Sequence, residues 1–265
     1  SLLKDSAFRT MPYCFTASNP TVGQLLEAYR QTRSLRPAAV VVVGGGSILD
    51  VGKSLCCLYG AEIGSEDELR AAIRNKTLPS PAARWIGIPT TAGTGSEVTC
   101  WATIWDPDKN AKLSVESKEN YAYAALVDPS LAAGMPVSLA VSSGLDAAAH
   151  AIESYWAKAT NTVSQGLALR AIDTIMRDMD RLVSGDPAAH LSMAKGSMMA
   201  GLAFSNTKTT ACHSISYPLT MRYGIPHGAA VSMPIAPVMK LNAGLFADLP
   251  TLLRALHLNS AEEAG

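Results

Sequence analysis

Four residues between Gly144 and Gly228 have side chains that could bind a metal ion together. Asp146 and His150 lie four residues apart in an Ala-rich segment. Because an α-helix has 3.6 residues per turn, the two side chains would project from one helix face. Taken alone, this pair is equally compatible with a hydrogen-bonded core histidine beside an aspartate. One helix therefore offers two candidate ligands.

His213 and His227 supply two more candidate ligands, and the segment between them contains Pro218, Gly224 and Pro226, which favour turns. The chain can therefore bring both imidazoles to one point. One carboxylate and three neutral imidazoles suit a divalent first-row ion such as Fe²⁺ or Zn²⁺. Such an ion would act as a Lewis acid that polarises a substrate oxygen.

A glycine-rich turn lies upstream, where the apolar run Ala38 to Val43 predicts a buried parallel strand and is followed by Gly44-Gly45-Gly46-Ser47. Helical periodicity then continues to Leu58. Strand, glycine turn and helix in this order predict a phosphate cradle at a helix N-terminus, with a simple tight turn as the alternative. Asp50 is expected in the first helical turn, toward the ribose or nicotinamide side of a bound cofactor.

A hydroxyl-rich loop follows the second predicted strand, Trp85 to Ile88, and runs from Pro89 to Glu97. Its threonines, serine and glycines supply the hydroxyl and backbone donors that a nucleotide site needs. A turn that caps the next helix is the alternative.

The elements that must position these residues divide the chain in two. Further short strands are predicted at Thr103–Trp105, Lys112–Val115 and Ala124–Val127, with a hairpin turn at 106–110. Beyond Pro136 the periodicity is helical, and the predicted helices are Ser143–Ala157, Val163–Leu182, Ala188–Leu202, a segment around His213, and Gly228–Leu241. We therefore predict an α/β domain over residues 1–135 and an all-α domain over residues 136–265.

Composition excludes several classes of function. With 48% hydrophobic and 17% charged residues, the chain can form a sizeable core. Lysine plus arginine and aspartate plus glutamate both total 22, so no basic field favours nucleic acid. No signal peptide and no membrane span is predicted. The five cysteines contain no C-x-x-C pair, which favours reduced thiols and a cytoplasmic location.

Four motifs in order resemble the iron-containing (group III) alcohol dehydrogenases. They are Gly44-Gly45-Gly46-Ser47 with Asp50 and Lys53, Pro89 to Glu97, Asp146 and His150 with Ala151-Ile152-Glu153, and His213 with Pro226-His227-Gly228. The segments Trp101 to Asp106, Glu153 to Trp156 and His213 to Pro218 are most similar to the phosphonoacetaldehyde reductase branch.

The resemblance implies an α/β dinucleotide-binding domain and an all-α metal domain, the fold shared with dehydroquinate synthases, with the active site between them. It also implies hydride transfer between NAD(H) or NADP(H) and a small primary alcohol or aldehyde, in a homodimer or larger homo-oligomer. The implied metal ligands are Asp146, His150, His213 and His227. The implied cofactor-binding residues are Gly45, Gly46, Ser47, Asp50, Thr90, Thr91, Thr94, Ser96 and Lys112.

The sequence departs from the family at Tyr217, where many members have a histidine that is discussed as a proton relay. A tyrosine hydroxyl could still pass a proton, although its ordinary pKa of about 10 makes it a poorer shuttle near neutral pH. Lys208 and Arg222 flank His213 and could reach a phosphonate, and ordinary surface positions are the alternative.

The family's first strand and last helices have no counterpart here, so the sequence is expected to be truncated at both ends. Residues 260–265 are expected to begin a further helix. The sequence is also compatible with two other functions. One is a dehydroquinate synthase-like or glycerol dehydrogenase-like enzyme that uses a metal and NAD, and the other is an inactive structural subunit.

Overall fold

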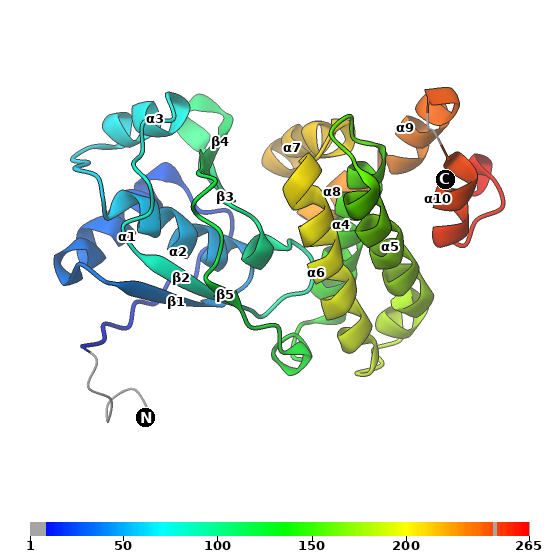
Figure 1. Ribbon diagram of the computed structural model, residues 1–265, viewed down its shortest axis with the longest axis horizontal. Coiled ribbons are helices and arrows are strands. Elements are labelled where there is room, and N and C mark those ends of the chain that lie inside the picture. Colours follow the sequence, from blue (N-terminus) through cyan, green and yellow to red (C-terminus); the bar gives the residue numbers. More distant parts are fainter. Residues whose placement is uncertain (1–8, 246–247, 265) are drawn as a thin grey trace.

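A computed structural model describes residues 9–245 and 248–264. Figure 1 shows two halves side by side, an α/β half formed by the first part of the chain and a helical half formed by the rest. The predicted fold class is confirmed in this arrangement. The last strand of the sheet ends at Ala125, and the first helix of the helical half begins at Val137. The exact domain boundary at residues 135 and 136 stays a prediction.

The α/β half contains a small parallel sheet and a separate antiparallel hairpin. Its strands are β1 (Ala39–Gly44), β2 (Arg84–Pro89), β3 (Trp101–Asp106), β4 (Ala111–Glu116) and β5 (Ala124–Ala125), and its helices are α1 (Val22–Thr32), α2 (Gly46–Leu58) and α3 (Glu66–Arg74). The sheet has the order β1-β2-β5, with Val42 opposite Gly87 in the parallel pair. The strands β3 and β4 pair with each other, as the predicted hairpin requires.

The helix α2 connects the sheet to the hairpin. It begins directly after the β1 strand, and Gly52 faces Val42 so closely that a Cβ atom there would lie 2.3 Å from a valine methyl. On its other side, Val51, Leu55 and Leu58 are buried in a core that includes Ile104 of β3. The packing of α2 therefore fixes the end of β1 relative to the hairpin.

The helical half is built around three long helices that share one hydrophobic core. They are α4 (Val137–Trp156), α5 (Thr162–Val183) and α6 (Ala189–Thr207), and they are followed by α7 (Ala211–Tyr223), α8 (His227–Ser232), α9 (Ile235–Asn242) and α10 (Leu249–Ala255). Met193 is fully buried in that core. Many core positions of α4 are alanines, which allow the three helices to pack closely.

Three local predictions are wrong. The predicted helix Gly228–Leu241 is two helices, because Pro234 has no N–H to donate and its ring clashes with the preceding turn. The strand predicted at Ala124–Val127 pairs only at Ala124 and Ala125. Asp50 lies in the second turn of α2, since the helix begins at Gly46.

The two ends of the chain are described only in part. Residues 1–8 and 265 lie outside the described residues, so the predictions made there are not tested by the structure. At the other end, Ala261–Ala264 forms a short 3-10 helix. Within the described ranges, no helix combines the length and the hydrophobicity that are needed to cross a membrane.

Candidate metal and cofactor site

Three predicted ligands meet in the helical half. Asp146, His213 and His227 each offer a ligand atom, and these atoms lie within 4.8 Å of one another. Asp146 comes from α4, His213 from the first turn of α7, and His227 from the start of α8. The Nε2 atoms of His213 and His227 are 3.6 Å and 3.8 Å from Oδ1 of Asp146. Two helices and a helix start therefore aim their polar atoms at one point.

His150, the fourth predicted ligand, lies beside this group. Its Nδ1 atom is 3.8 Å from Oδ1 of Asp146, and its ring is 4.4 Å from that of His213, centroid to centroid. The His150 ring also stacks on Phe204, with ring centroids 4.1 Å apart. The helical spacing thus places Asp146 and His150 together, as expected.

The polar atoms of this cluster fit a bound cation. Oδ1 of Asp146, Nε2 of His213 and Nδ1 of His150 are all buried and have no hydrogen-bond partner. Buried polar atoms without partners carry a large desolvation cost, which a coordinated ion would offset. Burial lowers the pKa of His150 to about 3 and also lowers the pKa of His227, so both rings are neutral near pH 7 and can act as ligands.

Glu153 orients the ligand His213, a role that was not assigned from the sequence. Its fully buried carboxylate accepts a hydrogen bond from Nδ1 of His213, which leaves Nε2 pointing toward Asp146. The carboxylate also accepts from the backbone N–H groups of Cys212 and His213, at 2.7 and 3.3 Å. Burial by itself would raise the pKa of Glu153, but the interactions with His213 and Thr210 bring it down to about 2.

Glu153 therefore also caps helix α7, because its N-cap residue Thr210 makes no side-chain cap. A signal for this role exists in the sequence. Asp146, His150 and Glu153 follow the i, i+4, i+7 spacing of one helix face, and an acidic residue on a ligand-bearing face is a natural partner for a ligand histidine.

A cleft of about 240 Å³ connects the candidate metal site to the glycine turn of the α/β half. Among the predicted site residues, the cleft is lined by Gly46, Ser47, Asp50, Thr94, Ser96, Lys112, Asp146, His150, His213, Tyr217 and His227. The candidate metal ligands and the first turn of α2 therefore share one space.

Three predicted cofactor residues lie behind this lining. Gly45, Thr90 and Thr91 do not line the cleft, and they support the glycine turn instead. The backbone N–H of Thr90 donates to the carbonyl of Gly44 at 3.0 Å, and a Cβ atom on Gly45 would lie 3.2 Å from the methyl group of Thr91. The hydroxyl-rich loop thus packs against the glycines.

Close packing also explains the glycine at position 46. A Cβ atom there would lie 2.5 Å from the methyl group of Thr94, so no side chain fits. Gly46 and Ser47 form the first turn of α2, whose N–H groups have no partner within the helix and can face an anion. This arrangement fits the pyrophosphate of a dinucleotide.

Tyr217 lies at the junction of the two halves. It is one helical turn after His213, and its ring is nearly parallel to that of His227 with centroids 6.2 Å apart. Its hydroxyl oxygen accepts a hydrogen bond from Nζ of Lys112 on β4 at 2.7 Å. Tyr217 and Lys112 therefore form a hydrogen-bonded pair in the cleft, and the tyrosine keeps its own hydroxyl hydrogen to donate.

The two basic residues near His213, Lys208 and Arg222, differ in their position relative to the cleft. Lys208 lines the cleft and donates to Oε1 of Glu116 at 2.7 Å, whereas Arg222 is exposed and does not line the cleft. Only Lys208 is therefore placed to face a ligand there.

Solved structures share this architecture. The iron-containing alcohol dehydrogenase from Thermotoga maritima is 29% identical, with a TM-score of 0.84 over 93% of this chain and 67% of that one. The sulfoacetaldehyde reductase from Bifidobacterium kashiwanohense, solved with NAD⁺, is 29% identical, with a TM-score of 0.81 over 91% of this chain and 67% of that one.

Sequence comparison shows similarity to proteins of the same kind. The phosphonoacetaldehyde reductase of Streptomyces viridochromogenes is 32% identical over 80% of this chain, which spans 55% of that relative's length. The chain thus covers little more than half of this relative. Residues 2–129 match the family model for iron-containing alcohol dehydrogenase, and residues 140–261 match the C-terminal model of the same family. The glycine turn falls in the first match and the metal-binding cluster in the second, so the chain belongs to the iron-containing alcohol dehydrogenase family.

Proposed function

We propose that the chain binds a divalent metal ion and a nicotinamide cofactor in one cleft, as part of an enzyme that interconverts small primary alcohols and aldehydes. The supporting observation is the common lining of the cleft. Buried, unpartnered ligand atoms of Asp146 and His213 face the same space as the first turn of α2. Hydride transfer requires this proximity, because the nicotinamide must reach the substrate carbon.

The residues divide into three proposed roles. Asp146, His150, His213 and His227 would hold the ion, which when bound supplies Lewis-acid polarisation of the substrate oxygen. Gly46 and Ser47 would bind the pyrophosphate through backbone N–H groups. Asp50 would accept a hydrogen bond from the ribose or the nicotinamide amide, since its carboxylate lines the cleft. We place the domain boundary at residues 135 and 136.

For the substrate we propose a small aldehyde with an anionic group, such as phosphonoacetaldehyde. Two of the similar proteins are reductases of phosphonoacetaldehyde and sulfoacetaldehyde, which carry such groups. Lys112 and Lys208 line the cleft and could attract an anion, although each already has a hydrogen-bond partner.

The test is metal analysis followed by NADH and NADPH oxidation assays with a panel of aldehydes. The panel pairs phosphonoacetaldehyde with propionaldehyde, so that the effect of the anionic group is measured directly. We expect turnover with loaded protein, and a fall of roughly 100-fold or more for His213→Ala, since loss of a ligand removes the ion. Stoichiometric NADH consumption would exclude dehydroquinate synthase-like chemistry, in which the cofactor is recycled.

The absence of metal binding and of turnover on every aldehyde would refute the proposal. Equal catalytic efficiency on both members of the pair would refute only the anionic substrate.

A further inference from the structure

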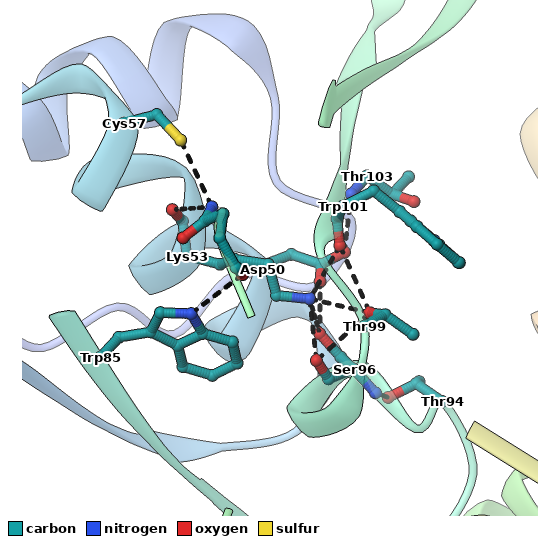
Figure 2. Close-up of polar contacts among 10 residues, drawn as sticks. Asp50, Lys53, Cys57, Trp85, Thr94, Ser96, Thr99, Trp101 and Thr103 are labelled. Atoms are coloured by element: carbon teal, nitrogen blue, oxygen red, sulfur yellow. Dashed lines mark hydrogen bonds and ion pairs between the residues drawn. The ribbon is translucent and has the colours of Figure 1, made fainter. Parts of the chain in front are cut away.

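Lys53 is a buried cation at the base of the cleft, and its ammonium group contacts no bulk water. Its side chain is fully buried in α2. Figure 2 shows its Nζ atom pointing away from the helix toward the segment that links the hydroxyl-rich loop to β3. An ammonium ion in such a place requires several oxygen partners to replace its hydration.

Backbone and hydroxyl oxygens replace the hydration of this ammonium group. Nζ of Lys53 is 2.8 Å from the carbonyl oxygen of Ser96, 3.0 Å from its hydroxyl, 2.9 Å from Oγ1 of Thr99 and 2.7 Å from the carbonyl oxygen of Trp101. The nearest carboxylate oxygen, Oδ1 of Asp50, is 3.8 Å away. Lys53 therefore joins α2 to the loop and to β3.

Asp50 depends on the same segment. It precedes Lys53 by one helical turn, and its two oxygens accept from the hydroxyl of Ser96 at 2.6 Å and from the backbone N–H of Thr103 at 2.8 Å. Each oxygen keeps a further lone pair, and the carboxylate faces the cleft. Asp50 can thus accept a hydrogen bond from a ligand in a fixed direction.

The hydroxyl of Ser96 is the link between the two charged groups. It accepts from Lys53 and donates its single hydrogen to Asp50, as Figure 2 shows. A serine has only one O–H, so this hydroxyl has no hydrogen left to donate to a cofactor. Ser96 lines the cleft, as expected of a cofactor-binding residue, but its hydroxyl bridges Lys53 and Asp50.

The oxygens that Lys53 holds belong to residues that line the cleft. Ser96, Thr99, Trp101 and Asp50 all contribute to its wall, whereas Lys53 itself does not. From below, the backbone carbonyl of Lys53 accepts from the side-chain amide of Asn120 at 2.9 Å. Lys53 is thus held through its backbone carbonyl and its ammonium group, and its ammonium group holds residues of the cleft wall.

We propose that Lys53 is a positioning residue for the nicotinamide cofactor, because it fixes Asp50 and the segment from Ser96 to Thr103 in the arrangement that forms the floor of the cleft. This inference rests on the proposed function. A purely stabilising lysine would change the fraction of folded protein, whereas a positioning lysine changes the cofactor affinity of the folded protein.

The first test is Lys53→Met, which keeps an unbranched side chain one atom shorter and removes the charge. The dissociation constants for NADH and NADPH are measured by fluorescence titration on folded protein, and the dissociation constant for Co²⁺ by chelator competition. We expect cofactor affinity to fall roughly tenfold or more, as for the loss of a charge-assisted hydrogen bond. We expect the Co²⁺ affinity to stay within about twofold, because the candidate metal ligands lie in the other half.

A milder pair of variants keeps the proposal testable if Lys53→Met does not fold. Thr99→Val removes one acceptor of the ammonium group with little change in shape. Thr32→Val is the matched control, since Thr32 is also buried in the α/β half and does not line the cleft. Only Thr99→Val is expected to weaken cofactor binding, by roughly threefold or more for one lost hydrogen bond.

The outcomes distinguish a failure of the proposed function from a failure of the positioning role of Lys53. If the native chain binds neither NADH nor NADPH, the proposed function fails and this inference fails with it. If the native chain binds a cofactor and neither Lys53→Met nor Thr99→Val weakens that binding, only the positioning role is refuted. Equal weakening by Thr99→Val and Thr32→Val would also refute it, because the effect would then be general destabilisation.

Discussion

At the scale of single residues, buried charges rather than exposed ones organise both ends of the cleft. Glu153 beneath the metal cluster and Lys53 beneath the glycine turn are each fully buried. Each forms hydrogen bonds with a segment that lies 43 or more positions later in the sequence. Neither lines the cleft, so each affects ligands only through the residues that it holds.

Glu153→Gln is expected to weaken metal binding by about 10- to 100-fold, the usual effect of removing a partner of a ligand histidine. The carboxylate accepts four hydrogen bonds through two oxygens, and an amide has only one oxygen to offer. Chelator competition with Co²⁺ or Zn²⁺ measures the affinity. Glu119→Gln on the surface is the control. An unchanged affinity would show that His213 does not need Glu153 to point at the ion.

At the scale of elements, the contact between α4 and α8 fixes the position of His227. Gly228 follows this histidine in the first turn of α8. A Cβ atom on Gly228 would lie 1.7 Å from the backbone carbonyl oxygen of Ser142 in α4, which cannot move independently of its helix. The glycine therefore lets the two helices approach closely.

Gly228→Ala is accordingly expected to lower the free energy of unfolding by about 1–3 kcal/mol, as for other overpacked positions, and to weaken metal binding. The control is Gly166→Ala, inside helix α5 beside open space, which should be neutral or stabilise the protein by roughly 0.5–1 kcal/mol. Urea unfolding and Co²⁺ titration measure the two effects. If Gly228→Ala bound Co²⁺ as tightly as the native protein, α8 could shift without moving His227.

The elements also show what the sequence could predict. Periodicity located the two long sheet strands, the hairpin and the helices α4 to α6, because each buries a regular pattern of side chains. The helix spacing placed Asp146 beside His150. Periodicity did not predict the break at Pro234, where helical side chains continue on both sides of the proline.

Local spacing places Glu153 on the ligand-bearing face of its helix, but the partners of Lys53 and Glu153 lie on distant segments that no local pattern identifies. The oxygens around Lys53 come from residues 43 to 48 positions later, and the partners of Glu153 lie 57 to 60 positions later. Sequence spacing predicts which residues share a face, and only the packed fold shows which faces meet.

At the scale of the whole molecule, the hairpin of β3 and β4 connects the two halves. Besides the contact between Lys112 and Tyr217, Glu116 of β4 accepts from Lys208, which follows α6. Trp101 of β3 also packs edge to face against Phe204 of α6. The hairpin therefore forms one wall of the cleft and holds it against the helical half.

The ion pair between Glu116 and Lys208 should make stability depend on pH. The hydrogen bond from Lys208 lowers the pKa of Glu116 below its ordinary value of 4.5. The stabilising contribution of the pair is therefore present above that value and is lost as the pH falls through the lowered pKa. For this partly exposed pair we expect about 0.2–1 kcal/mol relative to Glu116→Gln. Unfolding of both proteins is compared from near neutral pH down to about pH 3.

The difference between native protein and Glu116→Gln should decrease toward the acid end and shrink in high salt. A difference that persists below the lowered pKa would mean that Glu116 stabilises the protein through packing rather than charge. Lys118→Gln, an exposed charge change near the same turn, serves as the control.

The hairpin of β3 and β4 contacts both the candidate cofactor site and the candidate metal site. Its strand β3 supplies the backbone N–H that holds Asp50, and its strand β4 supplies the lysine that contacts Tyr217 beside His227. We therefore expect a bound metal ion and a bound cofactor to influence each other's affinity through this ribbon. Thermodynamic reciprocity then requires that metal raise cofactor affinity by the same factor by which cofactor raises metal affinity.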